Sequence, residues 1–220
     1  MKFSRLPKFR FLVILWLCSP PANAQNSFDL FAGYAFTSKL ESDVSLDIAL
    51  TPAGFQYQRF LKSWNTSLGL TSVFSSASYQ TADTQKSGVF YSVGLTVSNN
   101  FFEGKHLKAG WSLAYYPYTV LAVASQTKVS VNDQTIVHSS VTSFSGNQGF
   151  GAKIGAFYPG KKSAKYRIGS ELEYTQHKFN RRSIKVVSSN PDLSPGRDTV
   201  EEANETLGIG SILFLVGLTI

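Results

Sequence analysis

Residues 28–36 read FDLFAGYAF, and apolar side chains occupy every second position of this stretch. Its even-numbered residues end with the aromatic pair Tyr34 and Phe36, whereas its odd-numbered residues include Asp29 and Gly33. Successive side chains of a β-strand point to opposite faces of the sheet, so a period of two is typical of a strand. The stretch therefore predicts a strand whose apolar face opposes a face of mainly small and polar side chains.

The same alternation recurs along the rest of the chain. With a first strand at 28–37, it predicts further strands at 54–61, 67–75, 89–98, 107–115, 149–158, 166–175 and 206–220. Three of the links are short, and four are longer and more polar, at roughly 38–53, 79–87, 117–143 and 180–204. An even number of strands, with short turns at one end and long loops at the other, is typical of bacterial outer-membrane barrels. We therefore predict an all-β fold, an eight-stranded antiparallel up-and-down transmembrane β-barrel.

The composition of the two strand faces separates a membrane barrel from a soluble one. The face opposite the apolar residues consists mainly of glycine, serine and threonine with a few charges of both signs, which suits the narrow lumen of an eight-stranded barrel. Aromatic residues gather near both ends of the strands, as expected at two membrane interfaces. The short-turn group is Phe60, Trp64, Phe101, Phe102, Tyr158 and Tyr166, and the long-loop group is Tyr79, Tyr115, Tyr116, Tyr118, Phe144 and Phe179.

Charged residues on the polar faces of two neighbouring strands predict an interior network of Lys153, Arg167, Glu171 and Glu173. If the turn between the strands is symmetric, Lys153 lies opposite Glu171, and a shift of two residues offers Glu173 instead. An isolated buried charge costs several kcal/mol, so opposite charges inside a barrel are expected to pair. The alternative is a surface salt bridge on a soluble sheet.

The first 24 residues have the features of a cleaved secretory signal. A basic start precedes the short apolar run FLVILWLC at 11–18, and Ala22-Asn23-Ala24 follows as an A-x-A cleavage site. We predict a signal peptide at 1–24 and a single outer-membrane β-barrel domain at 25–220. The only cysteine, Cys18, lies in the signal, and so do four of the formal +7 charges. The remaining +3 is no argument for a nucleic-acid partner.

The start FDLFAGYAF, the alternating strands and the end LGIGSILFLVGLTI resemble the small outer-membrane barrels of the OmpA/OmpX type. This resemblance is architectural and carries no catalytic motif. It implies a bacterial outer-membrane location, contact with outer-membrane lipid and lipopolysaccharide, and insertion by the barrel-assembly machinery. A monomer without cofactors is expected.

The leading functional hypothesis is a non-catalytic structural or interaction scaffold with long extracellular loops. In the fourth long link, Arg181, Arg182 and Lys185 are candidate contacts for lipopolysaccharide phosphates, since arginine suits bidentate phosphate binding. Their alternative is a solvated basic loop. A second hypothesis is a lipid A-modifying outer-membrane hydrolase, because His138 and Ser140 resemble the His-x-Ser pair of the eight-stranded lipid A deacylases. A third is a soluble exported β-barrel carrier.

Overall fold

The structure is a computed structural model that describes residues 25–41, 46–47, 49–62, 64–80, 85–131, 134–158, 166–188 and 199–219. The predicted signal peptide at 1–24 and residues 132–133 of the third long link lie outside these ranges. The strands are β1 (Gln25–Glu41), β2 (Leu46–Asp47), β3 (Ala49–Leu61), β4 (Thr66–Gln80), β5 (Gln85–Glu103), β6 (Lys108–Val131), β7 (Gln134–Gly146), β8 (Gln148–Tyr158), β9 (Tyr166–Ser188) and β10 (Thr199–Thr219). Over the described residues, no helix has both the length and the apolar character needed to cross a membrane.

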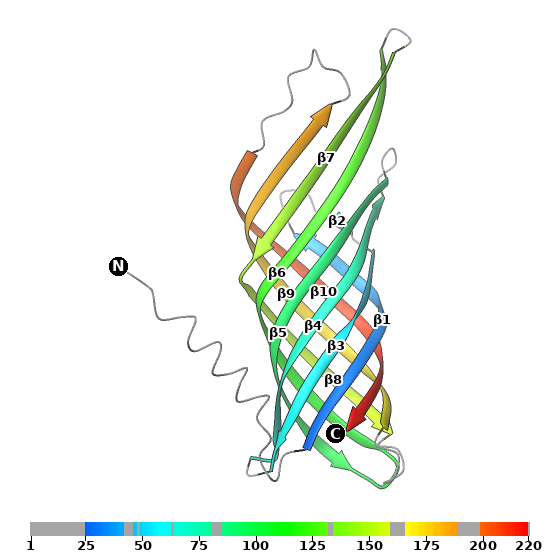
Figure 1. Cartoon of the computed structure of the whole chain (residues 1–220), viewed down its shortest axis with the longest axis vertical. Coiled ribbons are helices and arrows are strands. Elements are labelled where there is room, and N and C mark those ends of the chain that lie inside the picture. Colours follow the sequence, from blue (N-terminus) through cyan, green and yellow to red (C-terminus); the bar gives the residue numbers. More distant parts are fainter. Residues whose placement is uncertain are drawn as a thin grey trace, which may run out of the picture.

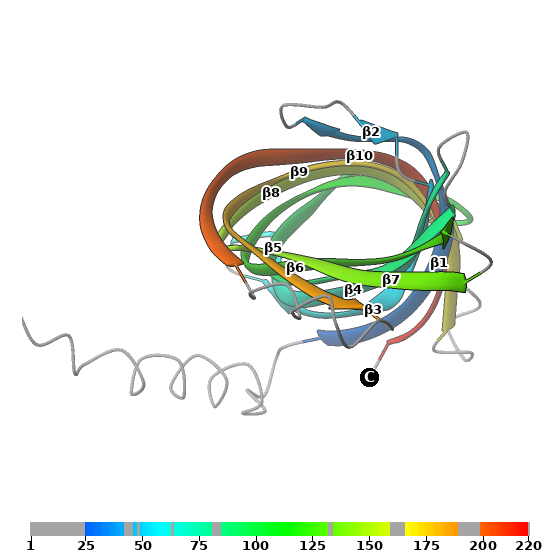
Figure 2. The ribbon, with the colours of Figure 1, turned by 90° about the horizontal axis from the view of Figure 1, so that it is seen from above.

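The strands close into one antiparallel ring of eight positions, as the alternation predicts. Apart from β2 and the step from β7 to β8, each strand pairs with the next strand in the chain, and β10 returns to pair with β1 along a seam from Ser27–Thr219 to Glu41–Thr206. Two labels share one position, because β7 and β8 both lie between β6 and β9 and are separated only at Asn147. The two-residue β2 pairs with β1 beside the ring. Figure 1 shows the tilted strands, and the view from above in Figure 2 shows the closed ring.

The apolar face of the alternation is the outer surface of the barrel. On the strand quoted first, Leu30, Tyr34 and Phe36 are exposed while Asp29 and Phe31 are buried. On the last strand, Phe214 is 65% exposed and Val216 60% exposed, although neither has a polar atom in its side chain. An apolar outer band is the surface that a transmembrane barrel turns toward lipid, so the prediction of a membrane barrel is confirmed.

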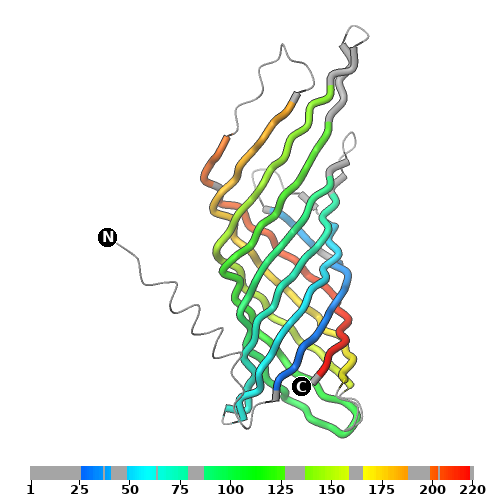
Figure 3. The backbone as a smooth tube through the Cα atoms, in the orientation of Figure 1, coloured from blue at the N-terminus to red at the C-terminus, as the bar shows by residue number. Residues whose placement is uncertain are grey.

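The four polar links hold more strand than the alternation predicts. β6 and β9 run on as strands to Val131 and Ser188, and β7 begins at Gln134, so most of the predicted third and fourth loops is hairpin. The third link extends the barrel as a hairpin, since β6 and β7 pair up to Val131 and Gln134. The predicted boundaries were wrong because a strand above the lipid meets water and its apolar alternation fades, while its backbone pairing continues. The tube in Figure 3 shows these strands rising well above the rest of the ring.

The barrel interior is polar near the short turns and apolar in its upper half, which is the half nearer the long links. The upper core includes Phe90, Leu121, Phe144, Phe179 and Leu207, each 7% exposed or less. This differs from the expected lumen of small residues. It also corrects the predicted upper aromatic belt, because Tyr116, Phe144 and Phe179 point inward, whereas Tyr115 and Tyr118 are exposed.

A β-bulge lies at Tyr116 and Pro117, where Tyr116 points into the lumen like Ser112 and Ala114 before it. The pairing of β5 with β6 jumps from Val93–Tyr118 to Leu95–Tyr115, which leaves Tyr116 and Pro117 as extra residues opposite Gly94. Proline cannot donate a ladder hydrogen bond, so a bulge is where a strand tolerates it. The missing side chain of Gly94 makes room for the ring, since a Cβ there would lie 2.7 Å from Tyr116 Cδ1.

Candidate functional site

The centre of the polar lumen is the ammonium group of Lys153, from β8. Its Nζ lies 3.4 Å from Glu173 Oε1 and 3.6 Å from Glu171 Oε2, both from β9, and the lysine side chain is 1% exposed. The pairing places Lys153 directly opposite Glu173 and Gly155 opposite Glu171, which is the register shifted by two residues from the symmetric turn. Gly155 leaves room for Glu171 to lean toward the lysine, because a Cβ there would come within 2.6 Å of Glu171 Cγ.

Residues from other strands complete the surroundings of this cation. Gln56 Oε1 of β3 accepts a hydrogen bond from Lys153 Nζ at 3.4 Å, and the ring centroid of Phe31 in β1 lies 5.1 Å from the same atom. Tyr116 Oη donates to Glu173 Oε1 at 3.2 Å. A charge taken out of water needs such partners, since unpaired it costs several kcal/mol. The polar face of 54–61 could have pointed to Gln56, and the inward alternation of Ser112 and Ala114, continued by two residues, could have pointed to Tyr116.

Arg167 belongs to a second ion pair, lower in the barrel. Its guanidinium binds both carboxylate oxygens of Asp29, with Nε to Oδ1 at 2.5 Å, and Asp29 is fully buried. The predicted network therefore separates, because Arg167 contacts Asp29 from β1 while Lys153 holds both glutamates. Further support for the guanidinium comes from Gln58 Oε1 at 3.4 Å and from the ring of Phe157 at 5.1 Å.

Gly217 makes the Asp29–Arg167 contact possible across an intervening strand. It lies on β10, opposite Asp29 on one side and Arg167 on the other. A Cβ on this glycine would stand 2.9 Å from Asp29 Cγ and 3.1 Å from Arg167 Cγ. The ion pair therefore bridges β1 and β9 over the strand between them, at the seam where the two ends of the chain meet.

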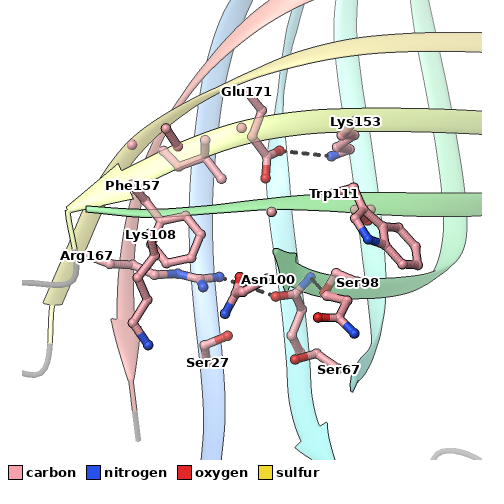
Figure 4. Close-up of a pocket in the computed structure, with 18 of the residues that line it drawn as sticks. Ser27, Ser67, Ser98, Asn100, Lys108, Trp111, Lys153, Phe157, Arg167 and Glu171 are labelled. Carbon is pink, nitrogen blue, oxygen red and sulfur yellow. Dashed lines mark hydrogen bonds and ion pairs between the residues drawn. The ribbon is translucent and has the colours of Figure 1, made fainter. Parts of the chain in front are cut away.

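A cavity of about 300 Å³ lies between these ion pairs and the short turns. Every position of the ring contributes to its wall, and Lys153 and Ser112 lie at its inner end. Figure 4 shows Lys153 and Glu171 at this cavity together with Arg167 and Ser98. The next cavity inward, beside Tyr116, Phe90 and His177, measures only about 10 Å³, which is room for about one water.

His177 lies in the closed part of the lumen, where it packs against aromatic rings. Its ring packs against Phe90 at 5.1 Å and Tyr116 at 5.0 Å, and its Nδ1 lies 3.0 Å from Thr119 Oγ1. Within the described ranges, no group of three or more His, Cys, Asp or Glu side chains is placed to bind a metal ion. The histidine is therefore part of the packing that closes the barrel.

The fourth long link was predicted to carry three cations, Arg181, Arg182 and Lys185, and all three lie on the strand β9. Arg182 pairs with Glu201 and, at 3.5 Å, with Glu205, and it stands opposite the buried Phe144. Arg181 and Lys185 are exposed, and among the described residues neither has an ion-pair partner. Lys178, three residues before Arg181 and also exposed, extends this row and was not among the predicted contacts.

His138 and Ser140 are two residues apart on β7, which is a strand at this point. Ser140 Oγ lies 2.6 Å from Ser125 Oγ, its cross-strand partner on β6. A nucleophilic serine needs its hydroxyl hydrogen-bonded to a base that a third group orients. Ser140 shares its hydrogen bond with another serine, and the residues opposite His138 are Thr127 and Ser188.

Several solved structures share this fold. A major outer membrane protein from Thermus thermophilus matches with a TM-score of 0.52 and 9% identity, over 90% of this chain and 99% of that one. Neisserial surface protein A matches with a TM-score of 0.42 and 13% identity, over 89% of this chain and 96% of that one. Ail, the attachment invasion locus protein of Yersinia pestis, matches with a TM-score of 0.42 and 13% identity, over 90% of this chain and 99% of that one. No family model matches the chain, and no curated protein matches it in sequence. Likeness at these identities shows the fold alone, which is that of the small outer-membrane β-barrels.

Proposed function

We propose that the chain is a bacterial outer-membrane β-barrel, exported through a cleaved signal peptide, that serves as a non-catalytic structural or interaction scaffold. One observation supports this most directly: an apolar outer band encloses an interior packed solid around Tyr116, which is fully buried. A lumen closed around Tyr116 is no channel for solutes, and the tall rim built by β6, β7 and β9 is the part that projects farthest from the barrel. We infer a monomer inserted by the barrel-assembly machinery.

Membrane fractionation tests the location. The protein is expected in the outer-membrane fraction, resistant to carbonate extraction, and to migrate differently on detergent gels before and after heating. Mass spectrometry is expected to show that the mature chain begins at Gln25. Full solubility without detergent would contradict the membrane barrel and favour the soluble carrier.

We propose lipopolysaccharide phosphates as the partner of the exposed cations on β9. The row comprises Lys178, Arg181 and Lys185, which are exposed near the upper end of the outer surface. Arg182 is left out, because Glu201 and Glu205 already neutralise it. Arginine and lysine on a surface next to lipid are suited to bind phosphate.

The test compares thermal stabilisation of the detergent-folded protein by lipid A with that by dephosphorylated lipid A. The variant Arg181→Gln/Lys185→Gln is expected to lose most of the phosphate-dependent stabilisation. A matched control, Lys62→Gln/Lys105→Gln, removes two exposed cations at the short-turn end and is expected to keep it. Equal losses in the two variants would show general charge attraction and refute this site.

The non-catalytic assignment is tested on lipid A itself. Mass spectrometry of lipid A from cells with and without the protein is expected to show the same acyl pattern. Loss of an acyl chain that depends on Ser140 would overturn the assignment and establish the hydrolase.

A further inference from the structure

The cavity at the short-turn end is a formed pocket and not a gap between ribbons. Its volume of about 300 Å³ is at the lower end of the range for ligand pockets. Asn65, Asn100 and Glu103 lie on its wall and belong to or adjoin the short turns, so the mouth opens at that end. The fully buried Tyr116 closes the lumen farther in.

Each cation around this pocket is already paired with a carboxylate. Lys153 is held by Glu171 and Glu173, and Arg167 is held by Asp29. At the mouth, Lys108 Nζ lies 3.5 Å from Glu103 Oε1. An anionic ligand would find no free cation among these described residues and would lose its hydration, and the carboxylates outnumber the cations by one, so the pocket disfavours anions.

The remaining wall is rich in polar atoms that have no hydrogen-bond partner. Ser112 is 4% exposed, and its Oγ makes no hydrogen bond within the described protein. Asn26 Oδ1 is also buried without a hydrogen bond, and Glu171 Oε2 has no hydrogen bond besides its ion pair with Lys153 Nζ at 3.6 Å; both residues line the same pocket. Buried polar atoms are nearly always satisfied, so three together at one pocket point to a hydrogen-bonding occupant.

We propose that this pocket is a binding site for a neutral polyhydroxylated molecule of about the size of a monosaccharide. Hydroxyl groups both donate and accept, and so they match Ser112, Asn26 and Glu171 at once. The ring of Phe157, on the same wall, offers an apolar surface for the C–H face of such a molecule. Entry is from the periplasm; this last point rests on the proposed outer-membrane location, whereas the binding chemistry does not.

The test titrates D-glucose into the isotopically labelled barrel, folded in detergent, and follows backbone amide shifts by NMR. Saturable shifts in the millimolar range are expected at pocket residues such as Ser98 and Ser112. D-glucuronate, which carries a carboxylate on a similar ring, is expected to bind at least about tenfold more weakly. Since this is measured in detergent, its failure would leave the outer-membrane location untouched.

Three variants make the result specific. Ser112→Leu fills the inner end of the pocket and is expected to abolish the shifts, while Ser112→Ala, which removes only the hydroxyl, is expected to weaken binding several-fold. Ser92→Ala is the matched control, because Ser92 is also buried and without a hydrogen bond but lies beside the inner cavity. If Ser112→Leu does not fold, the comparison of the two alanine variants decides.

The proposal is overturned by the absence of saturable shifts, by equal binding of D-glucose and D-glucuronate, or by equal effects of Ser112→Ala and Ser92→Ala. The first outcome would mean that the pocket holds water only.

Discussion

Replacing Lys153 with methionine tests whether the lumenal ion pairs hold the barrel together. Methionine keeps most of the length of the side chain and its packing against Phe31, so the change removes mainly the charge. Glu171 and Glu173 would then face each other in the lumen without the cation that lies 3.6 and 3.4 Å from them. Breaking a buried pair by removing one partner costs about 3–5 kcal/mol, which is a large part of a typical stability of about 5–15 kcal/mol.

A neutral version of the whole cluster separates charge from packing. In the triple variant Lys153→Met/Glu171→Gln/Glu173→Gln no uncompensated charge remains, so we expect stability within about 1–2 kcal/mol of the original chain. The charge swap Lys153→Glu/Glu171→Lys restores the balance in another way and should recover part of the loss that Lys153→Glu alone produces.

The measurement is reversible urea unfolding in lipid vesicles, followed by the fluorescence of Trp64 and Trp111. The midpoint is expected to fall for Lys153→Met with little change in slope, since the surface exposed on unfolding stays the same. A loss below about 1 kcal/mol, or a triple variant as unstable as the single one, would refute the view that pairing compensates these buried charges.

Further predictions concern the seam, the bulge and the closed lumen. In the same unfolding assay, Gly217→Ala should lower the free energy of unfolding by about 3 kcal/mol, because its methyl group displaces Asp29 from Arg167. A loss smaller than the one caused by a glycine-to-alanine change at an exposed position would contradict this. Tyr116→Phe removes the hydroxyl that donates to Glu173 and should cost about 1.5 kcal/mol; an unchanged midpoint would show that the hydrogen bond contributes nothing. In planar bilayers the original chain should show no stable conductance, and open-channel steps would contradict the packed interior.

Much of the site lay within reach of the sequence, but its connectivity did not. The polar faces of 149–158 and 166–175 indicated that Lys153 meets a glutamate in the lumen. The two predicted registers placed Glu171 or Glu173 opposite it, and the lysine contacts both. Arg167 was grouped with the wrong partners, since Asp29 is far away in the sequence and reaches it only over Gly217 when the ring closes. Arg182 was interpreted as a loop cation, although it is paired on a strand.

The sequence by itself determined the number of ring positions, the antiparallel order and which face meets lipid, because a strand repeats every two residues and lipid demands an apolar face. Only the tertiary structure decided how the lumen is filled. The bulge at Tyr116 and Pro117, the meeting of Asp29 with Arg167 and the pocket beneath Lys153 all depend on strand register. Register is set by the closure of the whole ring, and no local pattern of side chains encodes it.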